Sequence, residues 1–129
     1  MKTCIAIDTN IILRFLLKDH PQLSEKAKQL FSQAGKGACL IYLDEVIIAE
    51  VVWVLFSFYK KEKTEIIEQL TMLITQPWIV NNRKHTILAA FEMYRLSNFA
   101  YIDCWIYTVS KQLNYQFKTF DERLEKLHP

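Results

Sequence analysis

Short apolar runs alternate along this chain with longer stretches of helical periodicity, and this alternation limits the fold more than any other feature of the sequence. Apolar runs at 4–7, 39–43 and 78–80 are each followed by segments whose apolar residues recur every three or four positions. Parallel strands need such helical crossovers, so the pattern predicts an α/β fold with a mostly parallel sheet. The chain of 129 residues is short enough to form one domain, 1–129.

The expected elements follow from these runs and from local signals. Asp44 occupies an N-cap position before Glu45, so a long helix is expected over 45–59. Pro21 separates two helices near the N-terminus, at 11–16 and 23–31. Further helices are expected at 64–75, 84–96 and 103–113, with a fourth strand at 115–120 and a short helical tail after it.

Composition excludes several classes of protein. Two glycines cannot form a Gly-rich phosphate loop or a dinucleotide-binding fingerprint. A formal net charge of +2 is too small to indicate nucleic-acid binding by itself. The longest apolar run, 46–58, is interrupted by Glu50 and is too short to cross a bilayer.

The cysteines and histidines form no disulfide or zinc pattern. Cys4, Cys39 and Cys104 include no CxxC pair and follow no signal peptide, so we expect buried thiols in a reduced, cytoplasmic protein. The three histidines lie far apart and lack the spacing of zinc ligands: His20, His85 and His128.

Four acids lie among apolar residues, where an ionised carboxylate is costly unless something compensates it. They are Asp8, Glu50, Asp103 and Asp121. The run around Glu50 is so apolar that we expect this side chain to be packed on most sides. Few basic residues lie near the four acids in sequence, and strand ends and helix starts meet at one edge of a parallel sheet. We therefore expect the four to share a cation.

Oxygen-only ligands favour magnesium or manganese over zinc. Such an ion, with open positions, polarises a phosphate and activates water, so the chain needs no nucleophile of its own. Each acid also has an ordinary alternative role. Asp8 could be a turn residue, Asp103 or Asp121 a helix cap, and Glu50 a hydrogen-bonded core glutamate.

Four short segments resemble the signature segments of the PIN domain family, in the compact form found in VapC toxins. They are 5–10 (IAIDTN), 49–55 (AEVVWVL), 101–106 (YIDCWI) and 119–121 (TFD). The resemblance implies a three-layer fold with a parallel sheet of four to five strands flanked by helices. It also implies an endoribonuclease dependent on Mg²⁺ or Mn²⁺.

The resemblance also implies roles for individual residues. The four acids match the family's catalytic, metal-binding carboxylates, and Asn10 and Thr119 match polar residues that orient ligands or water. Arg14 could supply a counter-charge or form a surface salt bridge. Ala100 stands where many relatives carry a further acid, which favours one metal ion or a weak second site.

The partners implied by the resemblance are an RNA substrate, a second copy of the chain and a small antitoxin that places a basic side chain in the acid pocket. Basic stretches at 60–63 and 83–85 could contact phosphate or be solvated helix ends. Two other functions remain open. The chain could be an inactive binding module, or a metal-dependent DNA nuclease or phosphatase using the same acids.

Overall fold

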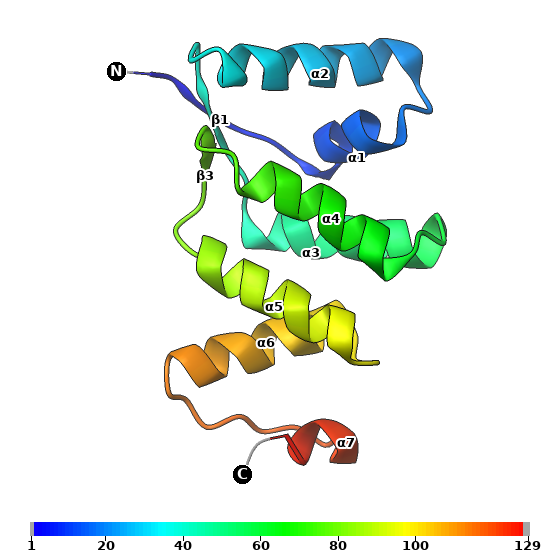
Figure 1. Cartoon of the computed structure of the whole chain (residues 1–129), viewed down its shortest axis with the longest axis vertical. Coiled ribbons are helices and arrows are strands. Elements are labelled where there is room, and N and C mark those ends of the chain that lie inside the picture. The colour runs from blue at the N-terminus through cyan, green and yellow to red at the C-terminus, as the bar shows by residue number, and fades with distance from the viewer. Residues whose placement is uncertain (1, 128–129) are drawn as a thin grey trace. The chain divides into compact units, whose positions relative to one another are not determined.

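The computed structural model describes residues 2–127 and divides into two compact units, one ending at Lys84 and the other beginning at His85. Figure 1 shows the elements in chain order. Each unit is described below by itself.

A parallel sheet forms the centre of the first unit. Its strands are β1 (Cys4–Ala6), β2 (Leu40–Tyr42) and β3 (Ile79–Val80), in the order β1-β2-β3. Ile41 of β2 is aligned with Ile5 on one side and with Ile79 on the other. Because every pairing is parallel, each connection carries helices, as the alternating pattern predicts.

Two helical connections join these strands. Between β1 and β2 lie α1 (Thr9–Leu17) and α2 (Pro21–Gly35). Between β2 and β3 lie α3 (Glu45–Trp53), the π-helix η1 (Val54–Phe58) and α4 (Lys63–Ile74). The expected continuous helix over 45–59 therefore ends in a π-helical turn, in which the Tyr59 amide donates to the Val54 carbonyl at 3.1 Å.

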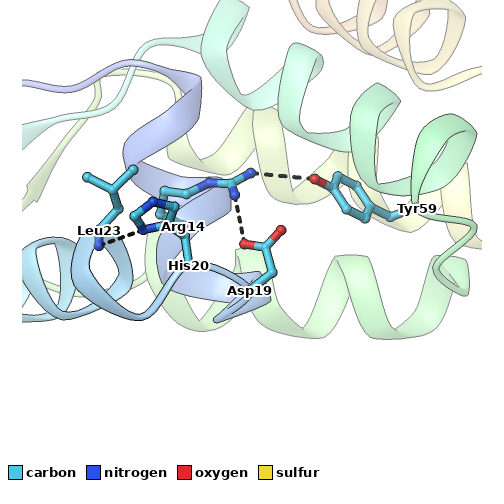
Figure 2. Close-up of polar contacts among 5 residues, drawn as sticks. All are labelled: Arg14, Asp19, His20, Leu23 and Tyr59. Atoms are coloured by element: carbon cyan, nitrogen blue, oxygen red, sulfur yellow. Dashed lines mark hydrogen bonds and ion pairs between the residues drawn. The ribbon is translucent and has the colours of Figure 1, made fainter.

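Local signals explain where the helices begin. Asp44 caps α3 by accepting a hydrogen bond from the Val46 amide at 2.8 Å. Pro21 is the first residue of α2, where its missing N–H costs nothing, and Nδ1 of the preceding His20 accepts from the Leu23 amide at 3.2 Å. Figure 2 shows this second cap.

The core of the first unit lies between the sheet and its helices. Ile12 of α1 and Ile41 of β2 are both fully buried. On α3 and η1 the buried side chains follow the spacing i, i+3, i+4, i+7, which is that of one helix face packed against a core. They are Ile48, Val51, Val52 and Leu55.

The second unit is helical. It contains α5 (Lys84–Leu96, beginning at the boundary), α6 (Tyr101–Gln112) and α7 (Glu122–Glu125). The Tyr101 ring packs against Phe91 and Tyr94, with centroids 5.6 and 5.8 Å apart. The Thr86 hydroxyl donates to Oε1 of Gln112 at 2.5 Å and ties α5 to the end of α6.

The predicted α/β class, with a parallel sheet flanked by helices, is confirmed, but the predicted strand count is wrong. Residues 2–127 form three strands, where four to five were expected. The expected strand at 115–120 pairs with no other strand in that part of the chain, and Phe120 is fully exposed. Apolar alternation describes a segment that could be half-buried, but a strand also needs a neighbour with which to form its ladder.

Candidate functional site

Asp8 lies at the carboxyl end of β1 and is the N-cap of α1. Its Oδ1 accepts a hydrogen bond from the Ile11 amide at 3.2 Å, and the side chain is exposed. The residue also lines a shallow hollow of about 440 Å³, together with Ile5 and Leu30. The local role of Asp8 is therefore that of a helix cap rather than a turn residue, and it uses one of the two carboxylate oxygens.

Glu50 lies in α3 and is exposed, so the expectation that it is packed on most sides is wrong. The buried face of this helix passes through Ile48, Val51 and Val52, and Glu50 lies outside it. Its Oε1 accepts a hydrogen bond from the hydroxyl of Thr9, the residue that follows Asp8. This contact connects the segment that carries the first acid to the helix that carries the second.

The face of α3 that carries Glu50 is apolar as well as exposed. Val46 and Trp53, four and three positions from Glu50, are 73% and 64% exposed. Phe58 in η1 is also 73% exposed. A helix that is apolar all round is normally covered on every side, so this face is a candidate for contact with another molecule.

Asp103 and Asp121 belong to the second unit. Asp103 lies in the first turn of α6, whose N-cap is Ala100, and its side chain has no polar partner within residues 2–127. Oδ1 of Asp121 caps α7 by accepting from the amides of Arg123 and Leu124 at 2.9 and 3.2 Å. The structure shows no polar contact between these two acids in the described part of the unit.

Three of the four acids share one pattern. Asp8, Glu50 and Asp121 each accept hydrogen bonds through one carboxylate oxygen, and the other oxygen has no protein partner among the described residues. None of the four forms an ion pair in that part of the chain. One oxygen orients each of these three carboxylates, and the other can take a ligand.

The described part of neither unit contains a complete metal cage. Within the described part of each unit, no three His, Cys, Asp or Glu side chains lie close enough together to hold a metal ion. The first unit links Asp8 and Glu50 through Thr9, and the second contains Asp103 and Asp121. That all four acids share one ion stays a prediction.

Comparison with known proteins gives the family. The family model of the PIN domain matches residues 5–128. The chain belongs to the PIN domain family. A curated relative, the VapC ribonuclease of Aquifex aeolicus (strain VF5), is 24% identical over 122 residues, which cover 94% of this chain and 90% of the relative. No solved structure matches the chain.

Arg14 of this PIN domain is committed to a local network. Its Nη1 lies 2.7 Å from Oδ1 of Asp19, and its Nη2 donates to the Tyr59 hydroxyl at 3.5 Å (Figure 2). Of the two roles considered for Arg14, the salt bridge is therefore the one present. The network joins the end of α1 to the end of η1.

The two residues expected to orient ligands lie near acids in this PIN domain, but within residues 2–127 only the side chain of Thr119 makes a hydrogen bond. The hydroxyl of Thr119 accepts from the Asp121 amide at 3.1 Å, which orders the segment that leads to the fourth acid. Asn10 is exposed, and its side chain has no polar partner within residues 2–127.

Sequence reasoning missed two groups near the sheet edge of the PIN domain. A threonine at a helix start is common and carries no signal of a partner 41 residues away, so the sequence does not reveal the contact of Thr9 with Glu50. Asn81, after β3, donates to the Leu43 carbonyl at 2.7 Å and to Oε1 of Glu45 at 2.8 Å. A polar residue directly after each short apolar run is the signal that could have found it.

Each of the two basic stretches contains both exposed and half-buried side chains. Lys60 is exposed, whereas Lys84 is half-buried and its ammonium donates to the Gln76 carbonyl at 3.0 Å. Burial lowers the pKa of Lys84. Arg83 and His85 of the second stretch are exposed, whereas Lys61 and Lys63 of the first are half-buried, so exposure favours neither stretch as a phosphate contact.

A larger cavity of about 730 Å³ in the first unit is lined mainly by residues of α1, α2 and α4. Phe15, Phe31 and Trp78 form part of its apolar lining, and Lys18 and Lys28 also line it. None of the four acids lines this cavity, so its size is no guide to the site of chemistry.

The remaining expectations concern thiols, histidines and membranes. All three cysteines are thiols rather than disulfides, and Cys39 and Cys104 are buried as expected. The expectation of a buried thiol is wrong for Cys4, which is exposed together with Ala6, whereas Ile5 between them is half-buried. His20 caps a helix, and His128 lies outside the described residues. None of the described helices is long and apolar enough to span a membrane.

Proposed function

We propose that this PIN domain is a divalent-metal-dependent endoribonuclease and the toxin component of a type II toxin–antitoxin pair. The observation that carries the proposal is the family match over residues 5–128, which contains all four acids. The similarity to a protein named VapC ribonuclease, over 94% of the chain, supports RNA as the substrate class.

The proposed metal ligands are Asp8, Glu50, Asp103 and Asp121, with Mg²⁺ or Mn²⁺ as the ion. Their donor chemistry fits such an ion, because carboxylate oxygens are the ligands that hard cations prefer. Magnesium is commonly held by one or two protein carboxylates, with water and substrate phosphate completing the shell. A pair such as Asp8 and Glu50, each with one oxygen unbonded in the described part, meets that requirement.

Two hydrogen bonds within the chain orient the Asp8 and Glu50 carboxylates, which in this proposal face the phosphodiester through a bound ion. The Ile11 amide holds Asp8, and the Thr9 hydroxyl holds Glu50. Two exposed carboxylates repel an RNA phosphate unless a cation lies between them. When bound, such an ion supplies polarisation of the phosphate and a lowered pKa of a coordinated water. With no protein nucleophile assigned, water is the group that attacks phosphorus.

Two protein partners belong to the proposal. A second copy of the chain is supported by the exposed apolar side chains of α3 and η1, among them Val46, Trp53 and Phe58. A small antitoxin that offers a basic side chain is supported by the unpaired charges of the four acids in the described part of the chain. The free cysteines and an RNA substrate both fit the cytoplasm.

Cleavage assays with the full chain test this function. We expect EDTA-treated protein to cut single-stranded RNA only after Mg²⁺ or Mn²⁺ is added. Asp8→Asn and Asp103→Asn should each slow cleavage by more than about 100-fold, beyond the loss typical of an outer-shell group. Glu92→Gln is the matched control, because Glu92 is an exposed acid paired with Arg95 and outside the proposed site.

The same assay separates the alternatives. Faster cutting of DNA, or of a small phosphate ester, would replace RNA with those substrates while keeping the acids in their roles. No cleavage of any of them, together with a melting temperature that Mn²⁺ does not raise, would identify an inactive binding module. Equal rates for the parent and both Asp→Asn variants would overturn the proposed site.

A further inference from the structure

We propose that Thr9 is a positioning residue, whose hydroxyl holds the Glu50 carboxylate in the orientation that binds the metal ion. The inference rests on the metal site proposed above and adds a residue to it. Within residues 2–127, the Thr9 hydroxyl is the one polar partner of the Glu50 side chain. Glu50 is otherwise exposed, so little else restrains it.

Thr9 itself is well restrained. It is the first residue of α1, next to the cap Asp8, and only 8% exposed, although Asp8 and Asn10 on either side are both exposed. A β-branched side chain in a helix has few χ1 rotamers, so its hydroxyl has a defined direction. At the first helical position no carbonyl four residues earlier belongs to the same helix, so the hydroxyl can donate to another element.

The direction of this hydrogen bond suits a ligand role for Glu50. The hydroxyl donates to Oε1, so Oε2 stays available. A glutamate has three rotatable side-chain bonds, and ordering it on binding costs free energy that a preformed hydrogen bond has already met. Outer-shell partners of metal-binding carboxylates act in this way.

A merely structural role for Thr9 would be to tie α1 to α3. The two roles differ in what removal of the hydroxyl changes. Loss of a purely structural hydrogen bond lowers only the free energy of unfolding, whereas loss of a positioning residue also lowers the affinity for the metal ion. Mn²⁺ binding measured by calorimetry on the full chain, without RNA, distinguishes them.

Three variants define the test. Thr9→Val keeps the shape of the side chain and removes the donor, and we expect it to weaken Mn²⁺ binding by about tenfold, the low end of the range for outer-shell groups. Thr9→Ser retains the hydroxyl and should bind Mn²⁺ as the parent does. In a Glu50→Gln background, Thr9→Val should cause no further loss, because the two residues act through one contact.

Thr86→Val is the matched control. Thr86 is also a buried threonine, 9% exposed, whose hydroxyl donates to a side chain on another helix, that of Gln112. We expect it to lower the melting temperature without changing Mn²⁺ affinity. Circular dichroism at the temperature of the titration confirms that each variant is folded.

The outcomes separate this inference from the metal site itself. If Glu50→Gln weakens Mn²⁺ binding and Thr9→Val does not, the role of Thr9 is overturned and the site stands. The role is also overturned if Thr86→Val weakens binding as much as Thr9→Val, or if Thr9→Val still weakens it in the Glu50→Gln background. If Glu50→Gln binds Mn²⁺ as the parent does, Glu50 is no ligand, and both proposals fail at this residue.

Discussion

The phenolic hydroxyl of Tyr42 donates a hydrogen bond of 2.5 Å to Oδ2 of Asp44, at the point where β2 leads into α3. Oδ1 of the same carboxylate accepts from the Val46 amide, so both oxygens are occupied. The Tyr42 hydrogen bond, followed by that of Val46, lowers the pKa of Asp44. Both carboxylate oxygens of Asp44 are therefore engaged within the protein. Asp8, which also follows a strand, has one oxygen engaged and one without a partner among the described residues.

This pair makes the stability of the protein depend on pH. The pKa of Asp44 in the folded state lies below its ordinary value of 3.8, so its stabilising contribution is present at neutral pH and is lost as pH falls through the folded pKa. We expect Tyr42→Phe to destabilise the protein at pH 7, with the difference from the parent shrinking below about pH 4. Urea unfolding between pH 3 and 7 measures this, and Tyr115→Phe is the control at an exposed tyrosine.

The Arg14–Asp19 contact should behave as a surface ion pair. Asp19→Asn should lower the free energy of unfolding by less than about 1 kcal/mol, and by less still in 1 M NaCl. Arg14→Gln should lower the free energy of unfolding by more than Asp19→Asn does, because it also removes the contact with Tyr59. Since Arg14 is engaged with these partners, neither change should alter Mn²⁺ affinity. Tighter Mn²⁺ binding by Arg14→Gln would instead identify Arg14 as a counter-charge to the acids.

The backbone conformation at the end of α6 predicts that the stability of the protein tolerates glycine at Asn114 but not a β-branched residue. This residue has φ of 58°, and the amides of Asn114 and Tyr115 donate to the carbonyls of Lys111 and Ser110, which is a Schellman motif. Asn114→Gly should be tolerated, whereas Asn114→Val should cost about 1–2 kcal/mol, because a β-branched residue resists the left-handed region. Thermal unfolding compares the two, and equal losses would contradict the motif.

The exposed apolar face of α3 and η1 should support self-association. We expect the parent chain to be a dimer at micromolar concentration, and Trp53→Asp to raise the dimer dissociation constant by more than about tenfold. Met72→Asp is the control, because Met72 is 69% exposed but lies on α4. Light scattering after size exclusion gives the mass. This face would be excluded as the dimer interface if the parent chain is a monomer, or if Trp53→Asp leaves the dimer dissociation constant unchanged.

Local signals predicted most elements of the fold. The helix at Lys84–Leu96 has the predicted bounds, and the Asp44 cap is where the sequence places it. Such features depend on neighbouring residues only: a capping side chain, a proline, or apolar positions three and four apart. The candidate acids were likewise visible as carboxylates among apolar residues, and the family match spans all of them.

The tertiary structure decided which side chains are exposed and which segments pair as strands. The sequence could not show that Glu50 lies on the uncovered side of an apolar helix, or that residues 115–120 lack a strand to pair with in the described chain. It also could not show that a threonine after Asp8 donates to Glu50. These properties depend on residues tens of positions apart, which periodicity cannot report. Local chemistry thus determined where most helices form and which acids are candidates for the site, and packing decided which strands pair and which side chains meet.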